Sequence, residues 1–109
     1  ARKRMAESAR RGKLYKEQPF VLGVPASELY EQKTEEWILV QGIIDVYFEE
    51  EDGLVVLDYK TDRVSDEKEL VDKYHAQLDY YAKALEQLTE KKVKEKLIYS
   101  FTLGKEIRL

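Results

Sequence analysis

Two aspartates interrupt apolar runs of the sequence. Asp45 stands in WILVQGIIDVYF (37–48), and Asp58 stands in LVVLDYKTD (54–62). A carboxylate inside such a run is costly to bury unless it is paired or bound to a metal ion. Lys60 follows Asp58 at i+2, so both side chains project from one face of a strand. Two carboxylates and an ammonium group on one face could hold Mg²⁺ and assist the water that cleaves a phosphodiester.

The two runs are β-rich and are separated by Asp52-Gly53, a strong hairpin turn signal, so they are expected to pair antiparallel. With a two-residue turn there, Asp45 lies opposite Lys60 and Tyr47 lies opposite Asp58. All four then share one face, and the two aspartates become diagonal neighbours, about 7 to 8 Å apart between Cα atoms. A loop one residue longer would turn one strand over, so the expectation depends on this register.

A simpler interpretation of the same residues is an Asp45–Lys60 salt bridge, with Asp58 capping the strand end. For an arbitrary protein this is the commoner case, because isolated ion pairs far outnumber catalytic groups. The sequence around these residues favours the metal site when the further motifs are taken together.

A long helix is predicted over 66–90 from apolar residues spaced by three and four. Gln77 and Tyr81 are at i and i+4, which places them on one helix face with Tyr74 one turn earlier. A buried amide and a buried phenol need hydrogen-bond partners, which either a site on the sheet or neighbouring backbone could supply. The helix is expected to begin after Ser65. No role is assigned to its His75.

The remaining elements frame these motifs. A helix is predicted over 3–11 and a strand over 14–22, which Pro19 restricts to the sheet edge or a bulge. A last strand is predicted over 96–103. The order α-β-β-β-α-β places a sheet against helices in an α/β or α+β sandwich.

Composition narrows the classes of protein and site. The chain has 109 residues, 43% of them hydrophobic and 38% charged, which fits one folded domain. Cysteine is absent and there is one His, so a disulfide framework, a thiolate zinc site and a Cys-His nucleophile are excluded within these residues. Any metal would be held mainly by oxygen. No run is long enough for a membrane span, and the start at Ala1 suggests a piece of a longer polypeptide.

The charge distribution is uneven. Residues 1–16 hold seven basic groups against Glu7 alone, a local charge of +6, whereas the rest carries −9. A basic arm on an acidic body can contact phosphates or can be the solvated face of a helix. The candidate nucleic-acid contacts are Arg2, Lys3, Arg4, Arg10, Arg11 and Lys13.

The segments GIIDVYF (42–48), LDYKTD (57–62) and QLDYY (77–81) together resemble the RecB-like branch of the PD-(D/E)XK nuclease superfamily. The resemblance covers essentially the whole chain, including KEQPFVL (16–22), and is strongest to the C-terminal nuclease domains of bacterial ATP-driven helicase–nucleases. It implies a restriction-endonuclease-like α/β core with a mixed sheet flanked by helices, as a single domain over 1–109.

The resemblance also implies roles for individual residues. Asp45 and Asp58 would bind Mg²⁺, or Mn²⁺ in its place, together with the main-chain carbonyl of Tyr59. Lys60 would assist the attacking water, and Gln77 and Tyr81 would position Lys60 or the DNA backbone. Related nucleases often carry an acidic residue at the place of Glu17, and they usually draw a further His ligand from an upstream segment. Without that ligand the isolated chain is expected to cleave poorly.

The function implied is that of a magnesium-dependent DNA exonuclease domain acting on single strands from an unwound duplex, during end processing for recombinational repair in the bacterial cytoplasm. A second helicase/nuclease subunit would be the partner. ATP would bind elsewhere in the parent chain, because no GxxxxGK[ST] loop is present. The alternatives are a catalytically silent DNA-binding or scaffolding domain with the same fold, and a small acid-rich structural domain without a ligand.

Overall fold

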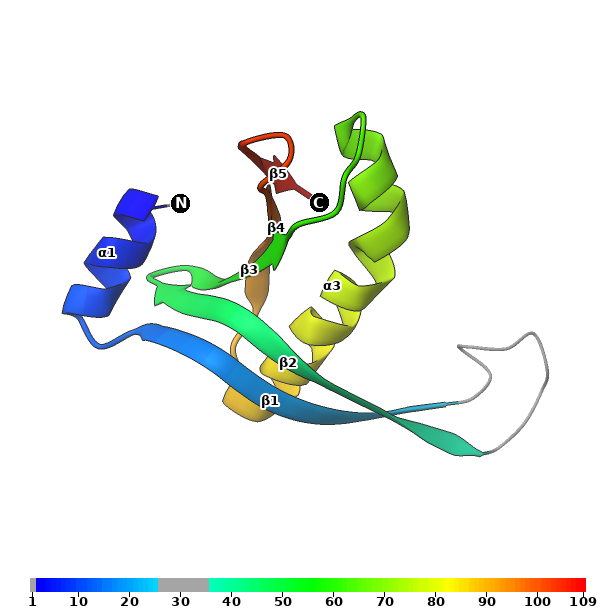
Figure 1. Cartoon of the computed structure of the whole chain (residues 1–109). Coiled ribbons are helices and arrows are strands. Elements are labelled where there is room, and N and C mark those ends of the chain that lie inside the picture. The colour runs from blue at the N-terminus through cyan, green and yellow to red at the C-terminus, as the bar shows by residue number, and fades with distance from the viewer. Residues whose placement is uncertain (1, 26–35) are drawn as a thin grey trace.

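The computed structural model describes residues 2–25 and 36–109 (Figure 1). A five-stranded mixed sheet of order β1-β2-β3-β4-β5 has β3 and β4 parallel and its other neighbouring pairs antiparallel. No helix among the described residues could cross a bilayer. The elements are α1 (Arg2–Arg10), β1 (Leu14–Pro25), β2 (Trp37–Glu50), β3 (Gly53–Lys60), α3 (Glu67–Thr89), β4 (Val93–Ser100) and β5 (Lys105–Arg108).

The predicted α/β class and the order of the first six elements are confirmed, and β5 is an addition. β1 is the edge strand that Pro19 predicted. The last predicted strand was placed too late, because β4 ends at Ser100 and a turn with Gly104 at φ 65° leads into β5. Gly104 adopts this left-handed conformation without the steric cost of a Cβ.

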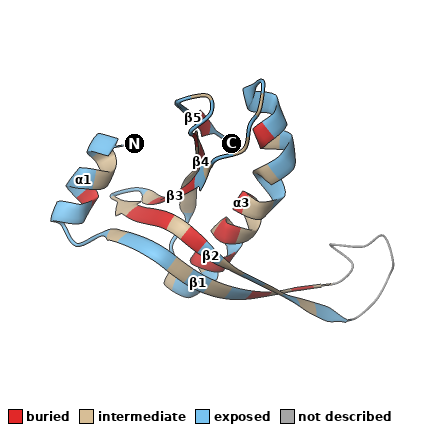
Figure 2. Ribbon diagram, viewed as in Figure 1, coloured by how far each residue is buried: buried red, intermediate tan, exposed pale blue. Residues whose placement is uncertain are grey.

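The two faces of the sheet bury separate cores, and Figure 2 shows buried positions along β2 and α3. Along β3, Leu54 and Val56 pack with α3, whereas Val55 and Leu57 pack with Met5 of α1. This alternation follows from the two-residue period of a strand. Of the leucines whose spacing predicted the long helix, Leu70, Leu78 and Leu85 are buried, whereas Leu88, in its last turn, is 59% exposed.

α3 begins one residue later than predicted. Asp66, rather than Ser65, is the N-cap, and its carboxylate accepts a hydrogen bond from the Glu69 main-chain N–H at 3.1 Å. An aspartate at this position satisfies a free N–H group and its charge suits the positive end of the helix dipole. The helix ends at Thr89 and is capped by Glu90, whose φ of 60° lies in the left-handed region.

The register of the β2–β3 hairpin differs from the prediction. The turn residues are Glu51 and Asp52, and Gly53 already pairs with Glu50. A Cβ on Gly53 would lie 2.8 Å from the Lys92 carbonyl oxygen, so glycine allows the strand to begin at this position.

The predicted pairs Asp45–Lys60 and Tyr47–Asp58 are therefore wrong. Tyr47 pairs with Val56, and the ladder ends at Val46 and Leu57. Because the shift is two residues, it leaves the predicted faces of β3 unchanged.

β2 and β3 separate directly after this last pair. β2 continues toward Trp37 paired with β1, whereas β3 continues to Lys60 paired with β4. Figure 1 shows the resulting fork, with the β1–β2 ribbon running one way, β3 and β4 the other, and α3 beside them. Asp45 and Asp58 are the first residues on the two arms of the fork.

The alternation of side chains also changes phase at the fork. Ile44 and Tyr47 both belong to the core on the α3 face, although an unbroken alternation would place them on opposite faces. Opposite this point, between the pairs Lys16–Val46 and Gln18–Ile44, Glu17 has φ 53°. A left-handed glutamate is uncommon, and such strained positions occur often at functional sites.

Candidate active site

Asp45 and Asp58 meet across the fork. The Asp45 carboxylate accepts a hydrogen bond from the Tyr59 main-chain N–H at 3.0 Å. A side-chain oxygen thus takes the place of the main-chain carbonyl that would accept this N–H between two paired strands. Asp58 is only 3% exposed, and its Oδ2 atom has no hydrogen bond of good geometry. Its close polar neighbour is the Lys60 ammonium, 2.6 Å away, which pairs with it as an ion. Lys60 therefore pairs with Asp58 and not with Asp45.

Burial, with a further contribution from the neighbouring Asp45 carboxyl, raises the pKa of Asp58 to about 6. The Lys60 ammonium opposes both effects. A buried carboxylate next to a second carboxylate is unfavourable in its charged form until positive charge compensates it. Such a pair is suited to a hard cation, which prefers carboxylate oxygens.

Lys60 is held from several sides. Its Nζ donates to Gln77 Oε1 at 2.8 Å and lies 3.9 Å from the centroid of the Tyr74 ring, in addition to its ion pair with Asp58. The side chain is 14% exposed. The structure thus places Gln77, in the middle of α3, beside Lys60.

Tyr81 lies one turn after Gln77 and is 6% exposed. Burial raises its pKa to about 12, and the charges of Asp58 and Asp45 add to the shift, so its hydroxyl stays protonated. The ring packs edge to face on Phe20 at 5.3 Å between centroids. A Cβ on Gly42 would come within 2.8 Å of the Phe20 ring, so glycine is needed there for this packing.

Two further residues adjoin the site that were not assigned to it from the sequence. The Tyr74 hydroxyl donates to the Asp62 carboxylate at 2.8 and 3.0 Å, and the Lys73 ammonium pairs with the same carboxylate at 2.6 Å. Tyr74 could have been found from its place on the helix face of Gln77. Asp62 follows β3 and carried no such signal.

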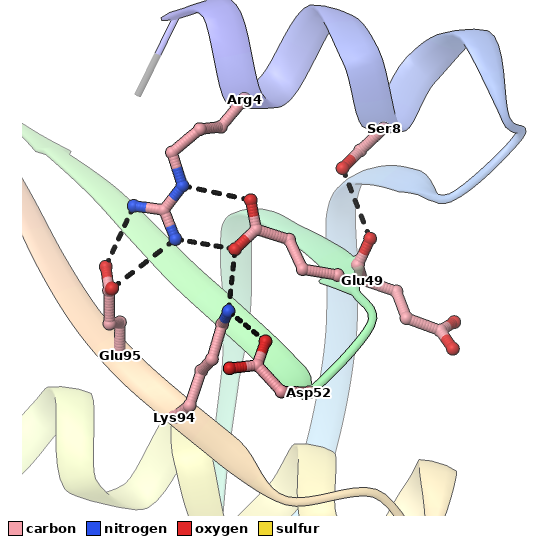
Figure 3. A network of polar contacts seen from close by, with 7 residues as sticks. Arg4, Ser8, Glu49, Asp52, Lys94 and Glu95 are labelled. Atoms are coloured by element: carbon pink, nitrogen blue, oxygen red, sulfur yellow. Dashed lines mark hydrogen bonds and ion pairs between the residues drawn. The ribbon is translucent and has the colours of Figure 1, made fainter.

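The basic residues of α1 fall into two groups, those that face carboxylates and those that are exposed. Figure 3 shows the network around Arg4, which belongs to the first group. The Arg4 guanidinium donates to Glu50 at 2.6 and 2.9 Å and to Glu95 at 3.0 Å. Lys94 joins the same network through Glu50 at 2.8 Å and through Asp52. These partners raise the pKa of Arg4 further above its already high value and lower the pKa of Glu50 to about 2.

Arg4 therefore joins α1 to the ends of β2 and β4, and its hydrogen-bonding groups face carboxylates. Ser8 strengthens the attachment, because its hydroxyl donates to the Glu49 carbonyl at 3.2 Å. Lys13 forms an ion pair with Glu49 at 3.7 Å. The exposed basic residues of α1 and the turn after it are Arg2, Lys3, Arg10 and Arg11.

The structure brings together two carboxylates, those of Asp45 and Asp58. Among the described residues, no group of three or more His, Cys, Asp or Glu side chains is placed to hold a metal ion. The His75 side chain is 60% exposed, and its Nδ1 atom lies 4.0 Å from Asp79 Oδ2. Asp79 is not one of the residues at the fork. Glu17 is exposed. Two carboxylates are enough for Mg²⁺, which usually keeps water and phosphate oxygens as its other ligands.

Comparison with known proteins shows which family and which relatives this chain is similar to. The family model of the PD-(D/E)XK nuclease superfamily matches residues 1–107. The A subunit of the ATP-dependent helicase/nuclease of Lachnoclostridium phytofermentans is 44% identical over 91% of this chain and 10% of its own length. The corresponding protein of Ruminiclostridium cellulolyticum is 44% identical over 98% of the chain and 9% of its own length. That of Clostridium botulinum strain Hall is 46% identical over 86% and 8%. The chain thus spans about a tenth of the length of these relatives.

Proposed function

Because the chain belongs to the PD-(D/E)XK nuclease superfamily, we propose that it is the magnesium-dependent DNA exonuclease domain of a bacterial helicase–nuclease. The expected family is confirmed, and the relatives carry the name of an ATP-dependent helicase/nuclease. The observation that carries the proposal is the convergence of Asp45, Asp58 and Lys60 at the fork between β2 and β3.

The metal site of this proposal is formed by the two aspartates. Nucleases of this superfamily generally use divalent metal ions. Asp45 and Asp58 would hold Mg²⁺ or Mn²⁺ with the main-chain carbonyl of Tyr59. The buried Asp58 Oδ2 has no well-formed hydrogen bond and is available as a metal ligand. When bound, the cation would supply positive charge beside the phosphate and lower the pKa of a water molecule.

The other residues act on the substrate and the water. The Lys60 ammonium donates to Gln77 and forms an ion pair with Asp58. Its positive charge can orient the attacking water or stabilise the negative charge that develops on the phosphate. Tyr81 keeps its proton, so its hydroxyl can donate to a phosphate oxygen.

The substrate of this domain would be single-stranded DNA supplied by unwinding, during processing of double-strand break ends for recombinational repair. A second helicase/nuclease subunit would be the partner, and ATP would be used outside these residues. The exposed cations of α1 and of the turn after it, together with Lys13, would contact phosphates. Arg4 is left out of this set, because Glu50 and Glu95 hold its guanidinium.

Metal binding tests the site directly. Isothermal titration of the chain with Mn²⁺ and Mg²⁺ should show binding that Asp58→Ala abolishes and that Asp72→Ala retains. Asp72 is a suitable control because it is an exposed carboxylate on α3. Equal binding by both variants would refute the metal site.

Cleavage of labelled single-stranded DNA tests the reaction. In the longer polypeptide that carries this chain, Lys60→Ala and Asp58→Ala should each lower the nuclease rate at least about 100-fold, the scale of losing a charge-stabilising group. Lys68→Ala, which removes an exposed lysine of α3, should not. DNA binding without any cleavage by the parent protein would instead support a silent DNA-binding domain.

A further inference from the structure

The Lys60 ammonium lies over the ring of Tyr74, to which the proposed reaction assigns no role. Its Nζ atom is 3.9 Å from the centroid of Tyr74, well within the range of about 6 Å in which a cation is attracted to the face of a ring. Because Lys60 is 14% exposed, water screens this attraction less than it would at the surface. The ring therefore favours one position of the ammonium group.

The ring itself is fixed from the other end. Its hydroxyl donates to both Asp62 oxygens, and Lys73 binds the same carboxylate. These two partners lower the pKa of Asp62, with Lys73 the larger cause, so this acceptor stays ionised. Asp62 is held in turn, because the Thr102 hydroxyl donates to its main-chain carbonyl at 2.7 Å.

We propose that Tyr74 is a positioning residue, whose ring, anchored by Asp62, holds the Lys60 ammonium between Asp58 and Gln77. The inference rests on the proposed function, since it assigns Tyr74 to the reaction through Lys60. Gln77 accepts an N–H of Lys60, Asp58 pairs with the ammonium as an ion, and the Tyr74 ring covers a further direction. Together these three groups restrict where the positive charge of Lys60 lies.

Tyr74 also packs against the core on the α3 face, so loss of the side chain could act through stability alone. Two substitutions separate the effects. Tyr74→Phe keeps the ring and removes the bond to Asp62, whereas Tyr74→Leu removes the ring. Tyr80→Leu is a matched control, because Tyr80 is a half-buried tyrosine of α3 whose ring neighbours Lys83 at 5.9 Å, outside the site.

The first measurement is nuclear magnetic resonance of the metal-free chain. The Lys60 ε-methylene protons should show an upfield ring-current shift that Tyr74→Phe retains and Tyr74→Leu removes. Nitrogen-15 relaxation should report a more mobile Lys60 ammonium in Tyr74→Leu than in Tyr80→Leu. A Lys60 ammonium equally ordered in both leucine variants would overturn the positioning role, whether or not the chain is a nuclease.

The second measurement is single-turnover cleavage by the parent protein. Tyr74→Leu should lower the rate constant about 2- to 30-fold, the range that corresponds to losing one cation–π contact, with DNA affinity changed less than about twofold. Tyr74→Phe should lose less, and Tyr80→Leu should match the parent. Retained cleavage by Lys60→Ala would refute the proposed function itself. Lost cleavage by Lys60→Ala, with full cleavage by Tyr74→Leu, would refute the role of Tyr74 alone.

Discussion

The Asp45 carboxylate accepts the main-chain N–H of Tyr59 at 3.0 Å, directly beyond the last paired residues of β2 and β3. This side chain bridges the point where the two strands separate. It leaves the adjacent Asp58 buried beside a second carboxyl group. The same residue thus stabilises the opening of the sheet and supplies a charge to the site.

Substitutions of Asp45 separate these two contributions. Asp45→Asn retains an oxygen acceptor for the Tyr59 N–H and removes the charge, so we expect it to weaken Mn²⁺ binding at least about tenfold without unfolding the chain. Asp45→Ala removes the acceptor as well and should be less stable than Asp45→Asn by about 1–2 kcal/mol. Urea unfolding without metal, together with calorimetric titration, measures both. Equal stability of the two variants would contradict the bridging role.

Asp58 should make the metal-free chain less stable at neutral pH. Its pKa is about 6 when folded, above its ordinary value of 3.8, so the folded state binds a proton more tightly than the unfolded state. Stability should therefore rise as the pH falls from about 7 toward 4. Asp58→Asn should remove this dependence and add roughly 1–3 kcal/mol at pH 7.5.

Urea unfolding in the presence of a chelator, at pH 5 and pH 7.5, measures the effect of Asp58. Asp72→Asn, at an exposed carboxylate, should leave the difference between the two pH values unchanged. The account would be contradicted if the unsubstituted chain were more stable at pH 7.5 than at pH 5 and Asp58→Asn were less stable than that chain at pH 7.5. The surroundings of Asp58 would then not disfavour its charged form.

Much of the site could be predicted because its parts are local in the sequence. Apolar runs interrupted by Asp45 and Asp58 predicted the two strands, and the helical spacing predicted that Gln77 and Tyr81 share a face. The register could not be predicted, because Asp52-Gly53 can supply either two turn residues or one turn residue and the first paired residue. The contact with Lys92 that favours the second case is distant in sequence.

The role of the basic helix was also hidden from the sequence. A run of cations predicts a charged surface, but only the fold shows that Arg4 faces Glu50 and Glu95. The change of phase at Glu17 had no sequence signal either, since glutamate rarely adopts positive φ. For Arg4 the deciding contacts join residues that are far apart in the chain.

Arg4→Met should lower stability by about 1–2 kcal/mol at pH 7, because half-buried Glu95 loses the Arg4 guanidinium and half-buried Glu50 keeps only Lys94; partial exposure limits the effect. The pKa of Glu50 is about 2 when folded and 4.5 ordinarily, so its contribution is present above about pH 4.5. It is lost as the pH falls from about 4.5 toward 2. Acid unfolding followed by circular dichroism should therefore show a smaller stability loss over this range in Arg4→Met. Parallel acid curves for both proteins would contradict this account.

The exposed cations of α1 and the turn after it should affect DNA binding through salt. Arg10→Gln with Arg11→Gln should reduce the slope of log affinity against log salt by about 1–1.5 for single strands, at roughly 0.7 per phosphate contact. Lys68→Gln, on α3, should leave the slope unchanged. Fluorescence anisotropy with labelled oligonucleotides at several salt concentrations measures it. An unchanged slope in the double variant would mean that these arginines lie off the DNA path.

Substitution by glycine should cost less stability at Glu17 than at a regularly paired position of the sheet. Its φ of 53° costs a side-chain-bearing residue about 1 kcal/mol or more, and glycine relieves that cost. We expect Glu17→Gly to leave the free energy of unfolding unchanged or raise it by up to about 1 kcal/mol. Gln41→Gly, at an exposed and regularly paired position of β2, should lower it by about 1 kcal/mol.

The opposite substitution at Glu17 tests whether this backbone shape supports the site. Glu17→Val places a β-branched residue in a conformation that it strongly disfavours, so it should cost about 1–3 kcal/mol. If the change of phase at Glu17 positions Asp45, Glu17→Val should also weaken Mn²⁺ binding, whereas Glu17→Gly should not. Since both variants remove the same charge, a difference between them reports backbone shape alone. Equal weakening by both variants would instead assign the effect to the lost carboxylate.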